Sequence, residues 1–328
     1  MSKPLVRIAL TGHRPDKLGG YDYLNPINLT IAVRIRDYLL SYLNQGYEVM
    51  AISGMALGAD QIFAKVALKL KKQGYSVKLE AAIPCDKQYS RWTPESKQVW
   101  QDIVDAADKV TYVSREPYKA YLMQKRNEYM VDACDTLIAI YNGTEGGTYN
   151  CLKDAIKKQK HIIYINPEAL VVDVKGDLLA SNCDVIFHQA NCMNTMNKGI
   201  AKQIRITYPA AYQADSDSPL TPKEKFGTHT YASVQSLAGK SMEVVNLYGQ
   251  YKYGRSEQQT DYDALRTALF SYLQDLQTRR GTIRHLKFGL PKNMGCRLAG
   301  GNWSLVKQIL QDAADHFTIR IYTYELYI

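Results

Sequence analysis

Along the first half of the chain, short apolar runs alternate with longer amphipathic stretches, and this alternation repeats several times. Apolar runs typical of buried strands cover residues 5–10, 49–52, 76–83, 110–113, 136–141 and 161–165. Stretches with apolar residues at helical spacing lie between them, at residues 27–43, 60–72, 100–107, 118–134 and 148–159. Strands that alternate with helices predict a parallel sheet with helices on both faces.

The pattern restarts after residues 166–168, whose Asn-Pro-Glu sequence is typical of a junction. Further strand-like runs then cover residues 170–174, 185–187 and 243–247, and a helix is predicted to start at residues 200–205. Residues 212–230 are rich in Ser, Asp, Pro, Thr and Lys, which predicts a long surface loop. We therefore expect two α/β domains, residues 1–168 and 169–328.

Composition agrees with two globular domains. The chain has 328 residues, of which 46% are hydrophobic and 22% charged. No apolar run approaches the roughly 20 residues that a membrane span needs, and the chain leads directly into a strand-like run, so we expect no membrane contact, no signal peptide and a cytoplasmic location. The 6 cysteines form no CxxC pair, which predicts reduced thiols, with neither a bound metal nor a cofactor.

The net charge is +9, and the basic excess is divided almost evenly between the two halves. Such a charge suits an anionic nucleotide ligand, and it also permits nucleic-acid binding or a solvated basic surface. We favour a nucleotide and do not expect nucleic acid as a direct partner. The oligomeric state stays open, a homo-oligomer included.

Glycine-bearing turns follow three strands of the first half. In an open α/β sheet, ligands bind beyond the carboxyl ends of the strands, where glycine lets backbone approach a phosphate closely. The residues expected to bind there are Thr11, Gly12, His13, Arg14, Ser53, Gly54, Met55, Gly58, Asp60, Gly143, Thr144, Gly146, Gly147 and Thr148. The alternative is that these glycines only form tight turns and that Arg14 makes a structural ion pair.

The TGHRP sequence at residues 11–15 and the SGMALGAD sequence at residues 53–60 resemble motifs of the SLOG superfamily of Rossmann-like nucleotide-binding domains. Relatives include phosphoribohydrolases with a GGxGTxxE motif. Alignment of Gly147 and Thr148 with that motif puts Cys151 where the catalytic Glu stands, and Arg126 matches the Arg of these enzymes. Because the acid is missing, we predict nucleotide binding rather than that hydrolysis.

In the second half, Asp184 to Pro209 reads as a strand, a polar loop and a helix start. Unpaired backbone N–H groups in the first turn of such a helix form an anion site. The loop at residues 295–303, with Gly295, Gly300 and Gly301, has the same features. Two such loops facing each other would hold a diphosphate.

These two segments, with VKGDLL at residues 174–179 and VNLYGQ at residues 245–250, resemble a macro domain, the ADP-ribose-binding module. The resemblance is strongest to ADP-ribose 1″-phosphate phosphatases and small ADP-ribosyl hydrolases. It implies a three-layer α/β/α fold. It also implies ADP-ribose, or a phosphorylated or cyclic derivative, as the ligand, besides a second nucleotide in the SLOG domain.

The same resemblance implies roles for single residues. Asp177 would accept a hydrogen bond from the adenine amino group, and Asn191 would contact the distal ribose. The backbone of Asn197, Lys198, Gly199 and Ile200 would bind the diphosphate. Tyr248, Gly249 and Gln250 would line the ribose pocket, and Arg255 would pair with a terminal phosphate. The second clamp would comprise Gly295, Cys296, Arg297, Leu298, Ala299, Gly300 and Gly301.

The sequence offers one candidate catalytic residue. Ala299 stands where some of these hydrolases hold a catalytic Asp, which disfavours their mechanism. His188, at the end of a predicted strand, is the candidate general acid or base; the alternative is a buried, hydrogen-bonded His. We predict hydrolysis of an ADP-ribose derivative such as ADP-ribose 1″-phosphate. A non-catalytic sensor or sequestering protein for NAD-derived nucleotides is the alternative, and a nucleic-acid-processing factor is a third reading.

Overall fold

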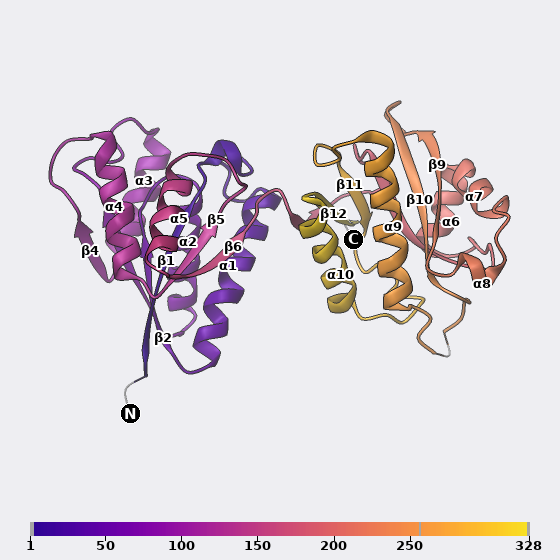
Figure 1. Ribbon diagram of the computed structural model, residues 1–328, viewed down its shortest axis with the longest axis horizontal. Helices are drawn as coiled ribbons and strands as arrows, with labels where there is room; N and C mark the ends of the chain where they lie inside the picture. Colours follow the sequence, from indigo (N-terminus) through magenta and orange to yellow (C-terminus); the bar gives the residue numbers. More distant parts are fainter. Residues whose placement is uncertain (1–2, 256, 327–328) are drawn as a thin grey trace. The chain divides into compact units, whose positions relative to one another are not determined.

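The computed structural model describes residues 3–255 and 257–326 and divides into two compact units. The first unit ends at Pro167 and the second begins at Glu168. Each unit is a mostly parallel sheet with helices on both faces (Figure 1). The predicted α/β fold class is therefore confirmed.

The first unit holds a six-stranded parallel sheet in the order β4-β3-β2-β1-β5-β6. Its strands are β1 (Leu5–Gly12), β2 (Glu48–Ser53), β3 (Val77–Ile83), β4 (Lys109–Tyr112), β5 (Thr136–Ile140) and β6 (His161–Ile165). Its helices are the 3₁₀ turn η1 (Pro15–Lys17), α1 (Pro26–Asn44), α2 (Ala59–Lys72), α3 (Pro94–Ala106), α4 (Ala120–Ala133) and α5 (Gly147–Lys157).

Alternating side chains along the strands fill a core on each face of this sheet. Ala9 and Leu137 point to the face that α4 and α5 cover, where they pack with Met130 and Leu152. Helices α1 and α2 pack together on the other face, and α3 packs on α2 (Figure 1). The chain builds outward from β1 to β4 and then returns to β5 on the opposite side of β1. The order of the strands therefore reverses between β1 and β5, which is where ligands bind in such sheets.

The second unit holds a six-stranded sheet in the order β7-β12-β11-β8-β10-β9, in which only β9 is antiparallel to its neighbour. Its strands are β7 (Leu170–Lys175), β8 (Val185–Asn191), β9 (His229–Gln235), β10 (Ser241–Gln250), β11 (Phe288–Pro291) and β12 (Arg320–Glu325). Its helices are α6 (Gly199–Thr207), α7 (Pro209–Ser216), α8 (Pro222–Lys225), α9 (Tyr262–Arg280) and α10 (Trp303–Phe317).

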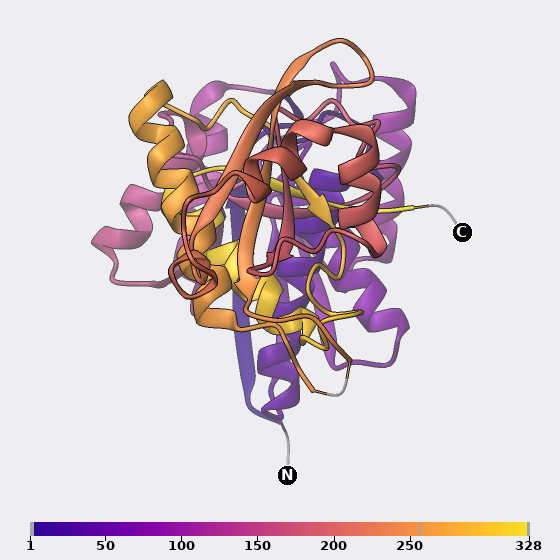
Figure 2. The same cartoon turned by 90° about the vertical axis from the view of Figure 1, so that its right-hand side faces the viewer.

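Two hydrophobic clusters lie on opposite faces of this sheet. Phe187 and Phe288 pack against α9 and α10 through Tyr272 and Val306. On the other face, a cluster around Ile186 includes side chains of α6 and α7, and Figure 2 looks onto these short helices. The unit therefore has three layers, α/β/α.

The loop prediction for residues 212–230 is wrong, because this segment contains the end of α7, all of α8 and the start of β9. Pro209 and Pro222 occupy first helical positions, where proline is favoured. Thr221 and Glu224 form a capping box at the start of α8. The helices are short and polar, so no apolar period marked them. Among the described residues, no helix has the length and apolar character to cross a membrane.

Candidate functional site

The predicted turns of the first unit gather at one edge of its sheet. Strands β1, β2 and β5 run parallel and end at Gly12, Ser53 and Ile140. Their following turns therefore lie together at the carboxyl edge, beside the reversal between β1 and β5. His13 joins two of these turns, because its Nε2 accepts a hydrogen bond from the backbone N–H of Asn142 at 3.1 Å.

Close packing accounts for three of the predicted glycines in this unit. A Cβ on Gly12 would overlap the Cβ of Ala59, and a Cβ on Gly54 would overlap the guanidinium of Arg126. Gly58 has φ +93°, and a Cβ there would lie 2.6 Å from the carbonyl oxygen of His13. At these positions the structure supports the tight-turn alternative, without any need for a ligand.

A buried ion pair lies behind the second turn. Arg126 Nη1 lies 3.1 Å from Asp60 Oδ2, and the two side chains are only 8% and 6% exposed. Arg126 also donates to the carbonyl oxygen of Gly54, and Asp60 accepts from the backbone N–H of Ala56 at 3.2 Å. Both predicted site residues therefore hold the turn from inside.

Cys151, at the position of the missing acid, is also buried. Burial raises the pKa of its thiol to about 12. The thiol therefore stays protonated and uncharged near neutral pH, and it does not replace a catalytic carboxylate.

The outer part of this edge is exposed and includes the N-terminus of α5. Helix α5 begins at Gly147 without a side-chain cap, and a Cβ on Gly147 would meet nothing within 4 Å. Gly143, Thr144 and Gly146 are exposed beside it, as is Arg14 across the edge. Lys17 donates to Thr144 Oγ1 at 2.7 Å, which adds a positive charge to the turn. A helix N-terminus with nearby cations suits a phosphate.

In the second unit, a cavity of about 920 Å³ is bordered by six separate segments of the chain. Of the residues predicted from sequence, those that border it are Asp177, Asn191, Asn197, Lys198, Gly199, Ile200, Gln250, Arg255, Gly295, Arg297, Leu298 and Ala299. Its volume lies within the range of about 300–1,000 Å³ that is usual for small-molecule sites.

Two loops with left-handed glycines border the cavity. Gly199 (φ +59°) begins α6, whose N-terminus has no side-chain cap. Gly295 (φ +73°) begins the other loop, and its carbonyl oxygen accepts from Gly301 N at 2.9 Å and from Thr260 Oγ1 at 2.6 Å. These bonds close the loop on itself, so its shape is set before any ligand binds.

Several predicted residues do not border this cavity: Tyr248, Gly249, Cys296, Gly301 and His188, with Gly300 bordering only an adjacent hollow. His188 is fully buried, and its Nε2 donates to Asn246 Oδ1 at 2.6 Å. Burial also lowers the pKa of this imidazole. The structure thus corrects the prediction of a general acid or base, because His188 does not reach the ligand site. The buried, hydrogen-bonded alternative describes it.

Asn191 borders the cavity, but its side chain holds its own loop. Its Oδ1 accepts from the backbone N–H groups of Met193 and Thr195 at 2.9 and 3.3 Å, and its Nδ2 donates to the Thr195 carbonyl at 3.0 Å. Asn191 therefore shapes the turn that follows β8.

Sequence reasoning missed several polar residues that border the cavity, among them Gln189 and Asp215. Gln189 donates from Nε2 to Gln250 Oε1 and to Thr260 Oγ1, both at 2.9 Å. Asp215 lies in α7, inside the segment that composition assigned to a loop. The only sequence signal was Pro209, which starts that helix.

Four cations surround the adjacent surface hollow: Lys198, Lys202, Arg255 and Arg297. All four are exposed, and none forms an ion pair within the described part of the chain. Three of them also border the cavity. This rim attracts anions toward the site.

Comparison with known proteins identifies the first unit. Residues 8–170 match the YspA SLOG family. The SPbeta prophage-derived protein YoqJ of Bacillus subtilis is 30% identical over 144 residues, which are 40% of this chain and 84% of that protein. The chain belongs to the YspA SLOG family. The predicted SLOG relationship is therefore confirmed, and we call this part the SLOG unit.

Another relative of this chain is the UPF0398 protein BH1768 of Halalkalibacterium halodurans, 29% identical over 184 residues, 54% of this chain and 97% of that protein. Among solved structures, the macrodomain of Mycobacterium tuberculosis DarG resembles this chain with a TM-score of 0.38 and 21% identity, covering 47% of this chain and 97% of that one. A score this low assigns no function to the unit that follows the SLOG unit.

The thiols of both units should be unreactive in the folded protein. Cys192 and Cys296 lie near the cavity, and burial raises the pKa of each to about 11, as it raises that of Cys151 in the SLOG unit to about 12. At pH 8 roughly one thiol in a thousand is ionised when its pKa is about 11, and about one in ten thousand when it is about 12. We expect negligible reaction with a chromogenic disulfide reagent over minutes and reaction of all 6 cysteines after denaturation. Because Cys296 is partly exposed, rapid reaction in the native protein of more than one thiol would contradict this burial.

Proposed function

We propose that the C-terminal unit is a macro domain that binds ADP-ribose, or a phosphorylated or cyclic derivative, in its cavity. One observation carries the proposal: segments around Asp177, Asn191–Ile200, Gln250–Arg255 and Gly295–Ala299, separated in sequence, border the same cavity. We further propose that the open edge of the SLOG unit binds a second nucleotide through the α5 N-terminus.

The cavity offers suitable partners for each part of such a ligand. Asp177 Oδ1 accepts from the backbone N–H of Leu179 at 2.9 Å, so Oδ2 remains for the adenine amino group. The uncapped N-terminus of α6 and the Gly295 loop supply backbone N–H groups for the diphosphate. Arg255 and Lys198, on the basic rim, suit a terminal phosphate.

The finer proposal is that the unit hydrolyses ADP-ribose 1″-phosphate. In this reaction water breaks the phosphate ester and releases ADP-ribose and inorganic phosphate. We expect the wild-type protein to release phosphate from this substrate and the Arg255→Met variant to release it much more slowly. A wild-type preparation that releases none over hours would exclude this activity.

The second candidate is a binder without turnover, which senses or sequesters NAD-derived nucleotides. The burial of His188 away from the cavity and the absence of an acid at Ala299 favour it. Tight binding of ADP-ribose together with no phosphate release from the 1″-phosphate would decide for this candidate.

Asp177→Asn should weaken ADP-ribose binding about tenfold or more, because a hydrogen bond to a charged group is lost. The Asn oxygen still accepts from Leu179, whereas its amide now faces the adenine amino group, donor against donor. An analogue with hypoxanthine, which accepts at this position, should lose less affinity. Asp217→Asn, at an exposed position that does not border the cavity, is the control; equal losses in both variants would refute the role of Asp177.

A further inference from the structure

A buried charged cluster adjoins the cavity at Asp215. Lys225 Nζ donates to Asp215 Oδ1 at 2.8 Å, and Tyr248 OH donates to the same oxygen at 2.8 Å. Asp215 and Tyr248 are 0% exposed and Lys225 is 1% exposed. Of these three residues, only Asp215 borders the cavity.

Each hydrogen-bond donor in this cluster already donates to an atom other than Asp215 Oδ2. The three protons of Lys225 go to Asp215 Oδ1, to the Asp215 carbonyl at 2.6 Å and to Asn194 Oδ1 at 2.6 Å. The proton of Tyr248 goes to Oδ1. Among the described residues, Asp215 Oδ2 has no hydrogen-bond partner, although it is buried. A buried, unpaired carboxylate oxygen is costly, and it becomes favourable when a ligand supplies the missing donor.

The position of Asp215 indicates which part of the ligand it meets. The contact between Lys225 and Asn194 joins the cluster to the turn that follows Asn191. Asn191 and Asp177 both border the cavity, and the macro-domain resemblance assigns the distal ribose to Asn191 and adenine to Asp177. The cluster is therefore at the distal end.

The charge of the group decides the chemistry of its partner. An ionised carboxylate accepts hydrogen bonds and repels phosphate. Within the described residues no cluster of metal-ligating side chains exists at this place. The partner of Asp215 that remains is a neutral hydrogen-bond donor. The proposed ligand carries such donors at this end, in the hydroxyls of its distal ribose.

We propose that Asp215 Oδ2 accepts a hydrogen bond from a hydroxyl of the distal ribose, and that Lys225 and Tyr248 position the carboxylate for it. The inference rests on the proposed function. Asp215 is then a specificity-determining residue, because a ligand without that hydroxyl leaves the carboxylate oxygen unpaired.

The test compares ADP-ribose with ADP, which lacks the distal ribose, by calorimetry on the full chain. The variant carries Asp215→Asn and Lys225→Met together, so the buried charges are removed as a pair and the protein keeps a neutral core. Asn keeps an oxygen for Tyr248 and places an N–H₂ group, a donor, where Oδ2 was. We expect the double variant to bind ADP-ribose about tenfold or more weakly and ADP within about threefold of the wild type.

Equal losses for both ligands, or no loss for either, would overturn the assignment. A second measurement needs no variant. It compares ADP-ribose with analogues that each lack one hydroxyl of the distal ribose, and the wild type should bind at least one of these analogues about tenfold or more weakly than ADP-ribose. If every such analogue binds like ADP-ribose, Asp215 does not read a hydroxyl. A wild type that binds neither ADP-ribose nor ADP would instead refute the proposed function, and this inference with it.

Discussion

Lys225→Met should lower the free energy of unfolding by about 3–5 kcal/mol, since it leaves the Asp215 carboxylate buried without its counter-charge. The side chains alone of Lys225 and Asp215 are 2% and 1% exposed, so water does not replace the missing partner. Among the described residues, Asp215 would retain only the hydroxyl of Tyr248 as a side-chain donor. Urea unfolding measures the change. The probe must report on the C-terminal unit alone, because the two units need not unfold together.

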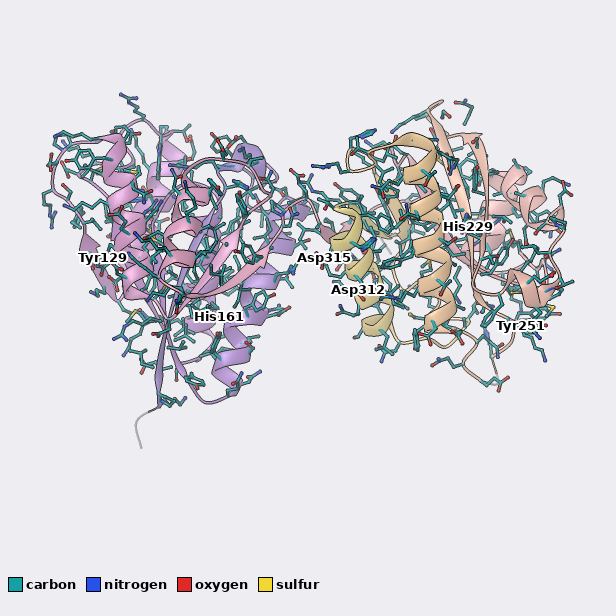
Figure 3. The ribbon with its side chains drawn as sticks, in the orientation of Figure 1. Tyr129, His161, His229, Tyr251, Asp312 and Asp315 are labelled. Carbon is teal, nitrogen blue, oxygen red and sulfur yellow. The ribbon has the colours of Figure 1, made fainter. Side chains whose placement is uncertain are left out.

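Two controls separate this effect from the loss of any ion pair. Arg266→Met breaks a pair with Asp312, labelled in Figure 3, whose side chains are 45% and 32% exposed. Such a pair contributes about 1 kcal/mol or less. Adding Asp215→Asn to Lys225→Met should restore much of the lost stability, because no unpaired charge then remains. Equal, small losses for Lys225→Met and Arg266→Met would contradict the buried cluster.

Gly295→Val is expected to reduce the affinity for ADP-ribose at least about tenfold. Gly295 has φ +73°, a conformation that costs other residues roughly 1–2 kcal/mol. Its new side chain would also overlap Gln189 Oε1 and lie within 2.9 Å of Thr260 Oγ1. Gln189 borders the cavity, and Thr260 holds the loop through its hydrogen bond to the Gly295 carbonyl. A shift of these groups would displace the diphosphate site. A binding titration by calorimetry measures the loss.

Gly239→Val is the matched control for that prediction. Gly239 has φ +77° in the turn between β9 and β10, and a Cβ there would meet nothing within 4 Å. The backbone strain is therefore similar, but the cavity is not touched. An unchanged affinity is expected for Gly239→Val, and comparable losses in the two variants would mean that general destabilisation, not the cavity, explains the effect.

The sequence predicted best those features that depend on local patterns. Apolar periods located the strands of the SLOG unit and, in the C-terminal unit, β7, β8 and β10, whereas β9, β11 and β12 were not predicted. Glycines after strands located the turns at their carboxyl ends. The loops of residues 197–200 and 295–299 could be predicted because their proposed binding groups are backbone N–H groups. Such groups come from a local helix start or glycine turn and do not depend on side chains from other parts of the chain.

Burial was the property that the sequence did not reveal. His188 follows an apolar run and looks like a residue at an exposed strand end, but β8 is covered by helices on both faces, so even its polar residues lie in the core. The Asp215–Lys225 pair was missed because both residues lie in a polar segment that composition assigned to a surface loop. Two short polar helices hold these residues, and only the fold shows that their charges face each other inside.

Packing also changed the interpretation of the SLOG motifs. Gly12, Gly54 and Gly58 permit close contacts with Ala59, Arg126 and the His13 carbonyl. Tyr129, labelled on α4 in Figure 3, donates to Glu80 Oε1 at 2.5 Å, so this helix is held against β3 by polar contacts as well. Among the described turns at this edge, the one before α5 is exposed and leads into a helix without a side-chain cap, which suits a phosphate.

The central claim is that the cavity of the C-terminal unit binds ADP-ribose, and a calorimetric titration of the full chain with ADP-ribose tests it most directly. We predict saturable binding at one site in that unit, weakened in Asp177→Asn and Gly295→Val and unchanged in Gly239→Val. No saturable heat with millimolar ADP-ribose, or binding that both cavity variants leave unchanged, would contradict it.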